Sequence, residues 1–183
     1  MKIRLLSTLS ILFLASALSF GQKYITKTGH IWFFSHTPME DIEAHNRQVV
    51  SSLDVSAGDM AFVLLIKSFE FKRALMQEHF NENYMESDKL PKANFKGKIT
   101  NLKQIDFKKD GTYAAEVTGD LTIHGVTKSV TYKGTIVVKG SSITANAKFT
   151  IIPQDYEIKI PSLVENKIAK EISVTVDVVY NAN

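Results

Sequence analysis

The sequence predicts an all-β domain, a sandwich or barrel of about eight short strands with one short helix between strands. From about residue 24 to residue 183, apolar and polar side chains alternate with a period of two, as in strands that have one buried and one wet face. Turn signals separate these stretches at short, regular intervals. There is no internal repeat, low-complexity tract or proline-rich linker, so one domain is expected.

The alternation defines eight candidate strands. They are residues 23–35, 44–54, 61–67, 93–106, 117–123, 130–139, 143–151 and 172–180. In the last of them Ile172, Val174 and Val176 alternate with Ser173 and Thr175. Such a pattern gives each strand an apolar face for the interior and a polar face for solvent.

Turns between the strands, and two segments that break the alternation, complete the predicted order of elements. Residues 108–111 and 139–142 have the composition of tight turns, and residues 124–128 indicate a hairpin. Between residues 69 and 88 apolar side chains recur at helical spacing among charged ones, which predicts a short amphipathic helix. Residues 160–170 break the alternation and fit a loop or a single helical turn.

The N-terminus has the layout of a secretory signal. Lys2 and Arg4 precede an unbroken apolar and small-residue run over residues 5–20, and a cut after Gly21 is expected. The run is just short of the roughly 17 residues that span a bilayer, so an uncleaved signal anchor is the minor alternative. We therefore expect a signal peptide at 1–21, a domain at 22–183, and a periplasmic or secreted location. No later apolar run approaches membrane-spanning length, so no stable membrane insertion of the mature chain is expected.

Composition argues against several functions. The chain has no cysteine, which excludes disulfides, thiolate metal sites and cysteine nucleophiles. The net charge of +3 comes from scattered residues, which does not favour nucleic-acid binding. His30 and His36 share a strand face but stand about 20 Å apart, too far for one metal ion. No nucleophile-elbow motif surrounds Ser35 or any other serine, so neither catalytic residues, a metal nor a cofactor is expected.

The inward strand positions and the predicted helix are the candidates for a ligand-binding wall. The candidate ligand-binding residues are Phe33, His36, Phe62, Leu64, Ile66, Phe71, Leu75, Met76, Phe80, Phe95, Leu121, Ile123, Tyr132 and Phe149. Taken singly, each apolar member is more often plain core than a ligand contact. Together, the many aromatic rings offer wide, weakly directional contacts that suit a chain of methylenes. The small residues Gly97, Gly119, Ala145 and Ala147 either leave room along an axis or allow strands to bend.

Two stretches carry a family resemblance. In the first, His79 and Tyr84 precede Pro91 and Phe95; the second is the run at 117–128, with its Gly-x-Leu-Thr-Ile-x-Gly-Val-Thr-Lys pattern. Both resemble signatures of the YceI-like family. The resemblance implies a lipocalin-like antiparallel β-barrel that encloses a polyisoprenoid or similar amphiphile in periplasmic or secreted proteins.

Two departures from the family pattern alter the expected cavity mouth. Residues 153–157 replace the usual Arg-Asp-Phe-Gly-like run, so a ligand contact by that arginine is lost. Residues 39–48 lack the usual Gly-x-Phe run.

Three functions follow as hypotheses. The first is a non-enzymatic binding protein that sequesters a long-chain lipid: a polyisoprenoid, an isoprenoid quinone or a fatty-acyl amphiphile. The second is a structural or interaction protein with a completely filled barrel, which internal volume would distinguish. The third is a hydrolase of an apolar substrate with His36 or His79 as general base, which needs a second titratable group within hydrogen-bond reach inside the cavity. A homodimer is left open.

Overall fold

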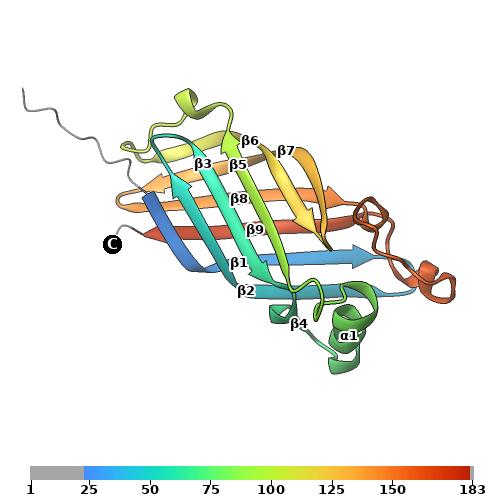
Figure 1. The fold of residues 1–183 in the computed structure, drawn as a ribbon. Coiled ribbons are helices and arrows are strands. Elements are labelled where there is room, and N and C mark those ends of the chain that lie inside the picture. The colour runs from blue at the N-terminus through green and yellow to red at the C-terminus, as the bar shows by residue number, and fades with distance from the viewer. Residues whose placement is uncertain (1–22, 182–183) are drawn as a thin grey trace, which may run out of the picture.

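The computed structural model describes residues 23–181, which form one closed antiparallel barrel (Figure 1). Its strands are β1 (Lys23–His36), β2 (Asp41–Asp54), β3 (Asp59–Leu65), β5 (Lys92–Ile99), β6 (Gly111–Ile123), β7 (Val126–Lys139), β8 (Ser142–Ile151) and β9 (Ile172–Asn181). Each pairs antiparallel with the next, and β1 pairs with both β2 and β9, which closes the circuit. The short β4 (Glu70–Phe71) adds to β2 outside this circuit. The predicted antiparallel barrel of about eight strands is confirmed.

Two strand boundaries differ most from the prediction. The strand predicted at 93–106 ends at Ile99, because the chain turns at Thr100 and then forms a 3-10 turn at Leu102–Gln104. Asn101 fixes this turn: its side chain donates to the Ala114 carbonyl and accepts from the Glu116 amide, both at 2.9 Å. Strand β6 begins at Gly111, six residues before the predicted start at 117. Its first residues are small or polar, and this hides their alternation in the sequence.

The predicted hairpins are present. The β6–β7 turn consists of His124 and Gly125, with φ of 51° and 77°, the pair of positive values that a two-residue type I′ turn requires. The β7–β8 turn likewise uses Gly140 at φ 58°. Both turns hold long strands in strict register, so the inward positions of three consecutive strands stay aligned.

Two covers flank one end of the barrel, at the right in Figure 1. The helical cover, residues 70–84, comprises β4, the helix α1 (Ala74–His79) and a π-helical turn at Phe80–Tyr84. The short helix predicted within residues 69–88 is confirmed as α1, which the π-helical turn extends. The loop cover, residues 152–171, contains 3-10 turns at Pro153–Tyr156 and Ser162–Lys167, consistent with the helical turn expected there. No helix among residues 23–181 is long and apolar enough to cross a membrane.

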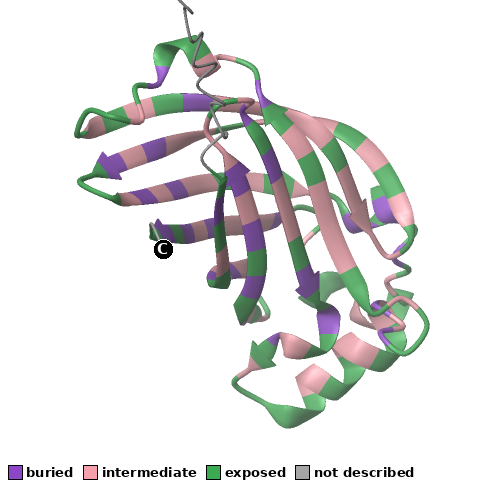
Figure 2. Ribbon diagram, turned by 60° about the vertical axis from the view of Figure 1, so that its left-hand side comes forward, coloured by how far each residue is buried: buried purple, intermediate pink, exposed green. Residues whose placement is uncertain are grey.

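The barrel interior differs between its two ends. Buried and exposed residues alternate along the strands (Figure 2). Ala44 and Ile66 are tightly buried next to the helical cover, and six further inward side chains are buried to a similar degree away from the covers. These are Leu53, Ile136, Val138, Ile143, Val178 and Tyr180, each at most 2% exposed. They fill the half of the barrel formed by the end of β2, the end of β7, the start of β8 and the end of β9. The other half, next to the covers, holds the candidate site.

Candidate functional site

The main cavity lies inside the barrel at the covered end and has a volume of about 510 Å³. Its walls come from the strand ends nearest the covers, such as Phe33 on β1, Leu64 on β3 and Val174 on β9. The two covers complete it with side chains including Phe80 and Ile160. The cavity is therefore built from segments far apart in the sequence, which the barrel closure brings together.

Aromatic contacts attach the helical cover to the barrel. Phe33 on β1 lies within 5.8 Å, centroid to centroid, of the rings of Phe69, Phe71 and Phe80. Phe71 and Phe80 are themselves 5.0 Å apart. Stacked, tilted and edge-on aromatic pairs of this kind add to the free energy of simple burial. The same rings that hold the cover in place also form part of the cavity wall.

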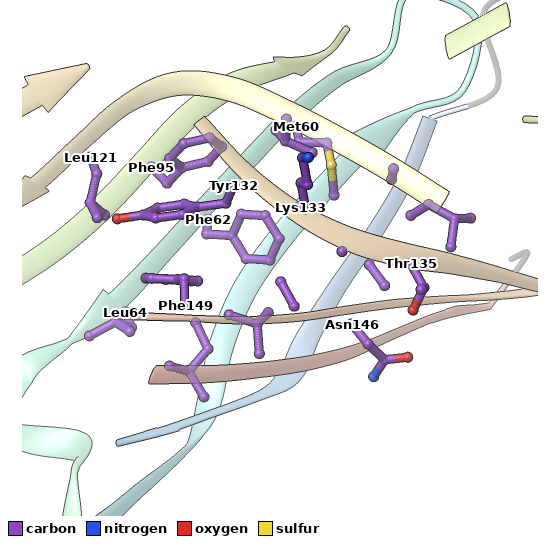
Figure 3. Close-up of a pocket in the computed structure, with 18 of the residues that line it drawn as sticks. Met60, Phe62, Leu64, Phe95, Leu121, Tyr132, Lys133, Thr135, Asn146 and Phe149 are labelled. Carbon is purple, nitrogen blue, oxygen red and sulfur yellow. The ribbon is translucent and has the colours of Figure 1, made fainter. Parts of the chain in front are cut away.

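A second cavity, of about 130 Å³, continues deeper into the barrel (Figure 3). The rings of Phe62, Phe95, Tyr132 and Phe149 gather around it, and Tyr132 stacks on Phe149 with centroids 3.8 Å apart. The two cavities adjoin, because they share lining residues. The shared residues are Ile31, Leu64, Ala93, Leu121 and Phe149. The two apolar cavities therefore follow one another from the covered end toward the filled half.

Polar side chains of the main cavity are concentrated at its rim. Arg73 of the helical cover forms an ion pair with Glu40 in the β1–β2 loop, and His79 and Lys167 border the same opening. Among residues 23–181, the only polar strand residue that lines the main cavity is Ser35, which is 1% exposed; its Oγ accepts the Ala169 amide hydrogen at 2.9 Å. The opening is thus polar and charged, and the interior is apolar.

Burial keeps the phenols of the wall uncharged. Burial, together with the neighbouring Tyr156, raises the pKa of Tyr132 to about 12. Burial also raises the pKa of Tyr84 in the helical cover. A raised phenol pKa favours the neutral form, so neither residue brings a charge to the wall at neutral pH.

The structure brings together all but one of the residues proposed from the sequence. Lining the main cavity are Phe33, Leu64, Ile66, Phe71, Leu75, Met76, Phe80, Leu121, Ile123 and Phe149. Three more of the proposed residues line only the deep cavity: Phe62, Phe95 and Tyr132. Their contact with a ligand stays a prediction.

His36 is the exception, since it lines neither cavity. It lies three residues after Phe33, an odd separation, and strand alternation turns its side chain to the opposite face. There its Nδ1 lies 2.6 Å from Asp41 Oδ1, with most of the imidazole exposed. His79, the alternative polar group considered for the mouth, does border the main cavity.

Sequence reasoning missed the contribution of the loop cover. Ile158, Ile160, Val164 and Ile168 line the main cavity, although their segment was expected to be a loop or a helical turn without a role in the site. Their signal was present in part: these four lie at even separations within a polar stretch, although Leu163 of the same stretch is also apolar and is exposed. Phe69 and Met85 were not among the predicted wall residues, but they also line the main cavity and are each 6% exposed.

The small inward residues have two different roles. A Cβ on Gly97 would lie 2.4 Å from Cζ of Phe95, so this glycine leaves the space that the Phe95 ring occupies. A Cβ on Gly119 would lie 2.3 Å from the Lys96 carbonyl oxygen, so here glycine allows close approach of two backbones. Ala145 and Ala147 line the deep cavity, where their short side chains leave volume open.

Two of the five histidines, His30 and His45, form a cluster that the sequence spacing did not reveal. On the outer face, His30 Nε2 lies 3.0 Å from His45 Nδ1, and Trp32 stacks on both rings. Burial, followed by the charge of Arg47, lowers the pKa of His30. This cluster faces away from the cavities. Within the described part of the chain, no three His, Cys, Asp or Glu side chains gather as a metal site would require.

Comparison with known proteins identifies the family. Residues 22–180 match the family model for the YceI-like domain. The chain belongs to the YceI-like family. A curated relative, a UPF0312 protein of Pseudomonas putida strain W619, is 34% identical over 98 residues, which cover 50% of this chain and 47% of the relative. The match thus spans about half the length of that relative. A UPF0312 protein of Pseudomonas fluorescens strain SBW25 is 40% identical over 73 residues, or 37% of this chain and 38% of the relative.

Solved structures share the YceI-like barrel. A polyisoprenoid binding domain from Saccharophagus degradans, implicated in plant cell wall breakdown, superposes with a TM-score of 0.76 at 14% identity, covering 88% of this chain and 98% of that one. BcnA of Burkholderia cenocepacia gives a TM-score of 0.69 at 17% identity, covering 82% and 95%. These likenesses confirm the lipocalin-like fold that the sequence resemblance implied.

Proposed function

We propose that this protein binds a single molecule with a long apolar tail inside its barrel and does so without catalysing a reaction on it. The observation that carries the proposal is the main cavity of about 510 Å³, which has an apolar wall, opens at a polar rim and continues into a deeper apolar cavity. Volume of this kind is uncommon, because protein interiors normally pack to the density of organic crystals.

The wall chemistry selects the class of ligand. Burying a methylene group stabilises a complex by about 0.8 kcal/mol and needs no directional partner, so a hydrocarbon tail suits the interior. A polar head group would lose its hydrogen bonds inside, whereas Arg73, Glu40 and Lys167 offer partners at the rim. The tail therefore enters first and the head stays at the opening. Polyisoprenoids, isoprenoid quinones and fatty-acyl amphiphiles all fit this arrangement, and the name of the Saccharophagus degradans domain favours the first class.

The two alternative functions receive less support. A filled barrel with no ligand is hard to reconcile with the two cavities, although the half around Tyr180 is indeed filled. A hydrolase would need His36 or His79 beside a second titratable group in the cavity. His36 pairs with Asp41 outside the cavities, and among residues 23–181 no hydrogen bond joins His79 to a titratable side chain.

We also propose that the protein is exported. The support is the N-terminal sequence, with Lys2 and Arg4 before the apolar run at 5–20 and small residues before Gln22. These residues lie outside the described part of the structure. A long apolar ligand that must cross an aqueous compartment gives such a carrier a physical purpose, since its solubility in water alone is very low.

Native mass spectrometry tests both proposals in one experiment. The complete chain is expressed in a bacterial host, purified without detergent, exposed to vesicles that contain prenols, and sprayed intact. We expect a 1:1 complex that releases a lipid on denaturation, and a polypeptide mass that begins at Gln22. A protein that remains bare after vesicle exposure would contradict binding, and an unprocessed mass would contradict export.

A pair of variants on one strand assigns the complex to the main cavity. Val174→Trp places a large ring in the cavity wall, whereas Val179→Trp makes the same change on an exposed outer position of β9. We expect Val174→Trp to abolish the lipid adduct and Val179→Trp to retain it. Equal adducts on both variants would show that the lipid binds elsewhere.

A further inference from the structure

We propose that the barrel selects its ligand by tail length and accepts about four to five isoprene units, or roughly 20 to 25 carbons, estimated from the volume that a bound hydrocarbon occupies. This inference rests on the proposed function and makes it specific. Its basis is a path of limited volume that is closed at its inner end.

The two volumes set the length. An apolar cavity of about 150 Å³ accommodates benzene, which corresponds to roughly 25 Å³ for each carbon. On that scale the main cavity of about 510 Å³ holds roughly 20 carbons. The deep cavity of about 130 Å³ holds roughly five more, the size of one isoprene unit.

The inner end of the path is closed by tightly packed side chains. Ile136 lines the deep cavity and is 2% exposed, and Val138 and Ile143 lie beyond it along β7 and β8 at 2% and 1%. At the far end Tyr180 is fully buried and its hydroxyl lies 2.6 Å from Ser51 Oγ. Side chains in such close packing do not yield volume without a large cost, so a longer tail has nowhere to extend.

The entry direction turns this closed path into a length limit. The charged groups at the rim hold the head at the opening, and the apolar interior takes the tail. A tail longer than the path must leave its remaining carbons in water beside the rim. Each methylene left in water loses the free energy of its burial, which amounts to a hundredfold or more in binding for each additional isoprene unit.

Extraction from vesicles measures the limit directly. Vesicles are loaded with farnesol, geranylgeraniol, geranylfarnesol, hexaprenol or octaprenol, incubated with the protein, and removed by sedimentation; the bound prenol is then quantified. A second arm uses saturated fatty alcohols of matched carbon number, which distinguishes prenyl from acyl tails. Vesicles are the reference because the membrane buries every carbon of every alcohol, so differences in water solubility cancel.

Each outcome has a defined meaning. We expect efficient extraction through geranylfarnesol and a fall of at least a hundredfold for hexaprenol and octaprenol. Extraction of octaprenol as efficient as that of geranylfarnesol would overturn the length limit and leave the proposed function intact. Extraction of no alcohol in either arm would overturn the proposed function itself.

Neighbouring alanines on β6 provide a matched pair of variants. Ala115 lines the deep cavity and is 5% exposed, whereas Ala114 is exposed on the outer face. Ala115→Leu adds three carbons, which fill roughly 75 Å³ of the deep cavity at the same scale. We expect it to lower the limit by one isoprene unit and Ala114→Leu to leave the limit unchanged.

Enlarging the deep cavity gives the opposite test. Phe62 lines the deep cavity but not the main cavity. Phe62→Ala removes six carbons, which opens space for about one further isoprene unit. We expect this variant to extract hexaprenol. Thermal unfolding by circular dichroism confirms that each variant is folded before it is scored. A limit that moves in neither variant would refute the assignment of the deep cavity as the end of the path.

Discussion

The hydroxyl of Tyr180 should contribute measurably to stability and nothing to ligand capacity. Ser51 Oγ donates to the Ala61 carbonyl oxygen at 2.9 Å, so the Tyr180 hydroxyl, 2.6 Å away, is the donor to Ser51. Both side chains are at most 1% exposed. Tyr180→Phe removes this donor and leaves a buried acceptor without its partner, at a cost of about 1 to 2 kcal/mol. For a domain of this size that cost lowers Tm by about 2 to 8 °C.

Urea unfolding followed by circular dichroism measures this loss. Tyr113→Phe is the matched control, because the Tyr113 hydroxyl donates to the Lys109 carbonyl at 2.9 Å in an exposed setting where water replaces it. We expect the control to change the free energy of unfolding by less than about 0.5 kcal/mol. Equal losses in both variants would refute the argument from burial. A changed tail-length limit in Tyr180→Phe would show that the filled half is not an inert end to the path.

Two further predictions concern the same framework. Burial raises the pKa of Tyr180 to about 12 from an ordinary value near 10. The stability that the neutral phenol provides is therefore fully present below pH 10 and is lost as pH rises through 12. The free energy of unfolding should fall more steeply with alkaline pH in wild type than in Tyr180→Phe, and parallel curves would contradict this. Gly119→Ala places a Cβ 2.3 Å from the Lys96 carbonyl oxygen and should destabilise the barrel by about 1 to 3 kcal/mol in urea, because the backbone must shift; a change below about 0.5 kcal/mol would contradict the close approach.

The period-two pattern predicted the cavity wall because it determines which face each side chain occupies. Once the strand containing Phe33 was placed, every second residue from Ile31 to Ser35 had to point inward, and the structure agrees. The same rule excludes His36 from the wall, since it lies an odd number of residues from Phe33. His36 was a candidate because it is a polar residue at the end of a strand, but strand geometry places its side chain on the outer face.

Contacts between residues far apart in the chain could not be predicted from the sequence. The pairing of His30 with His45 depends on the β1–β2 register, which contains irregularities between Thr26 and Ile31 that no local pattern reveals. The loop cover reaches the cavity through tertiary packing, so its apolar residues could be recognised only as unexplained. Cavity volume likewise depends on how many inward side chains fall short of the axis, which no count of strands determines.

The division of the barrel into a filled half and a hollow half bears on what the proposed ligand would add to stability. A closed cavity left by a truncated core side chain costs about 24 cal/mol for each Å³, so the main cavity of about 510 Å³, which opens at its rim, forgoes at most stabilisation on the order of 10 kcal/mol. That amount is comparable to the entire stability of an ordinary domain. The well-packed half around Leu53, Ile143 and Tyr180 must therefore maintain the fold when the cavity is empty. A tail bound as proposed would restore much of the missing contact, and if it binds only the folded state the barrel gains stability that rises with the logarithm of ligand concentration over Kd. A barrel selected only for stability would have filled this volume with its own side chains, as it has done at the other end.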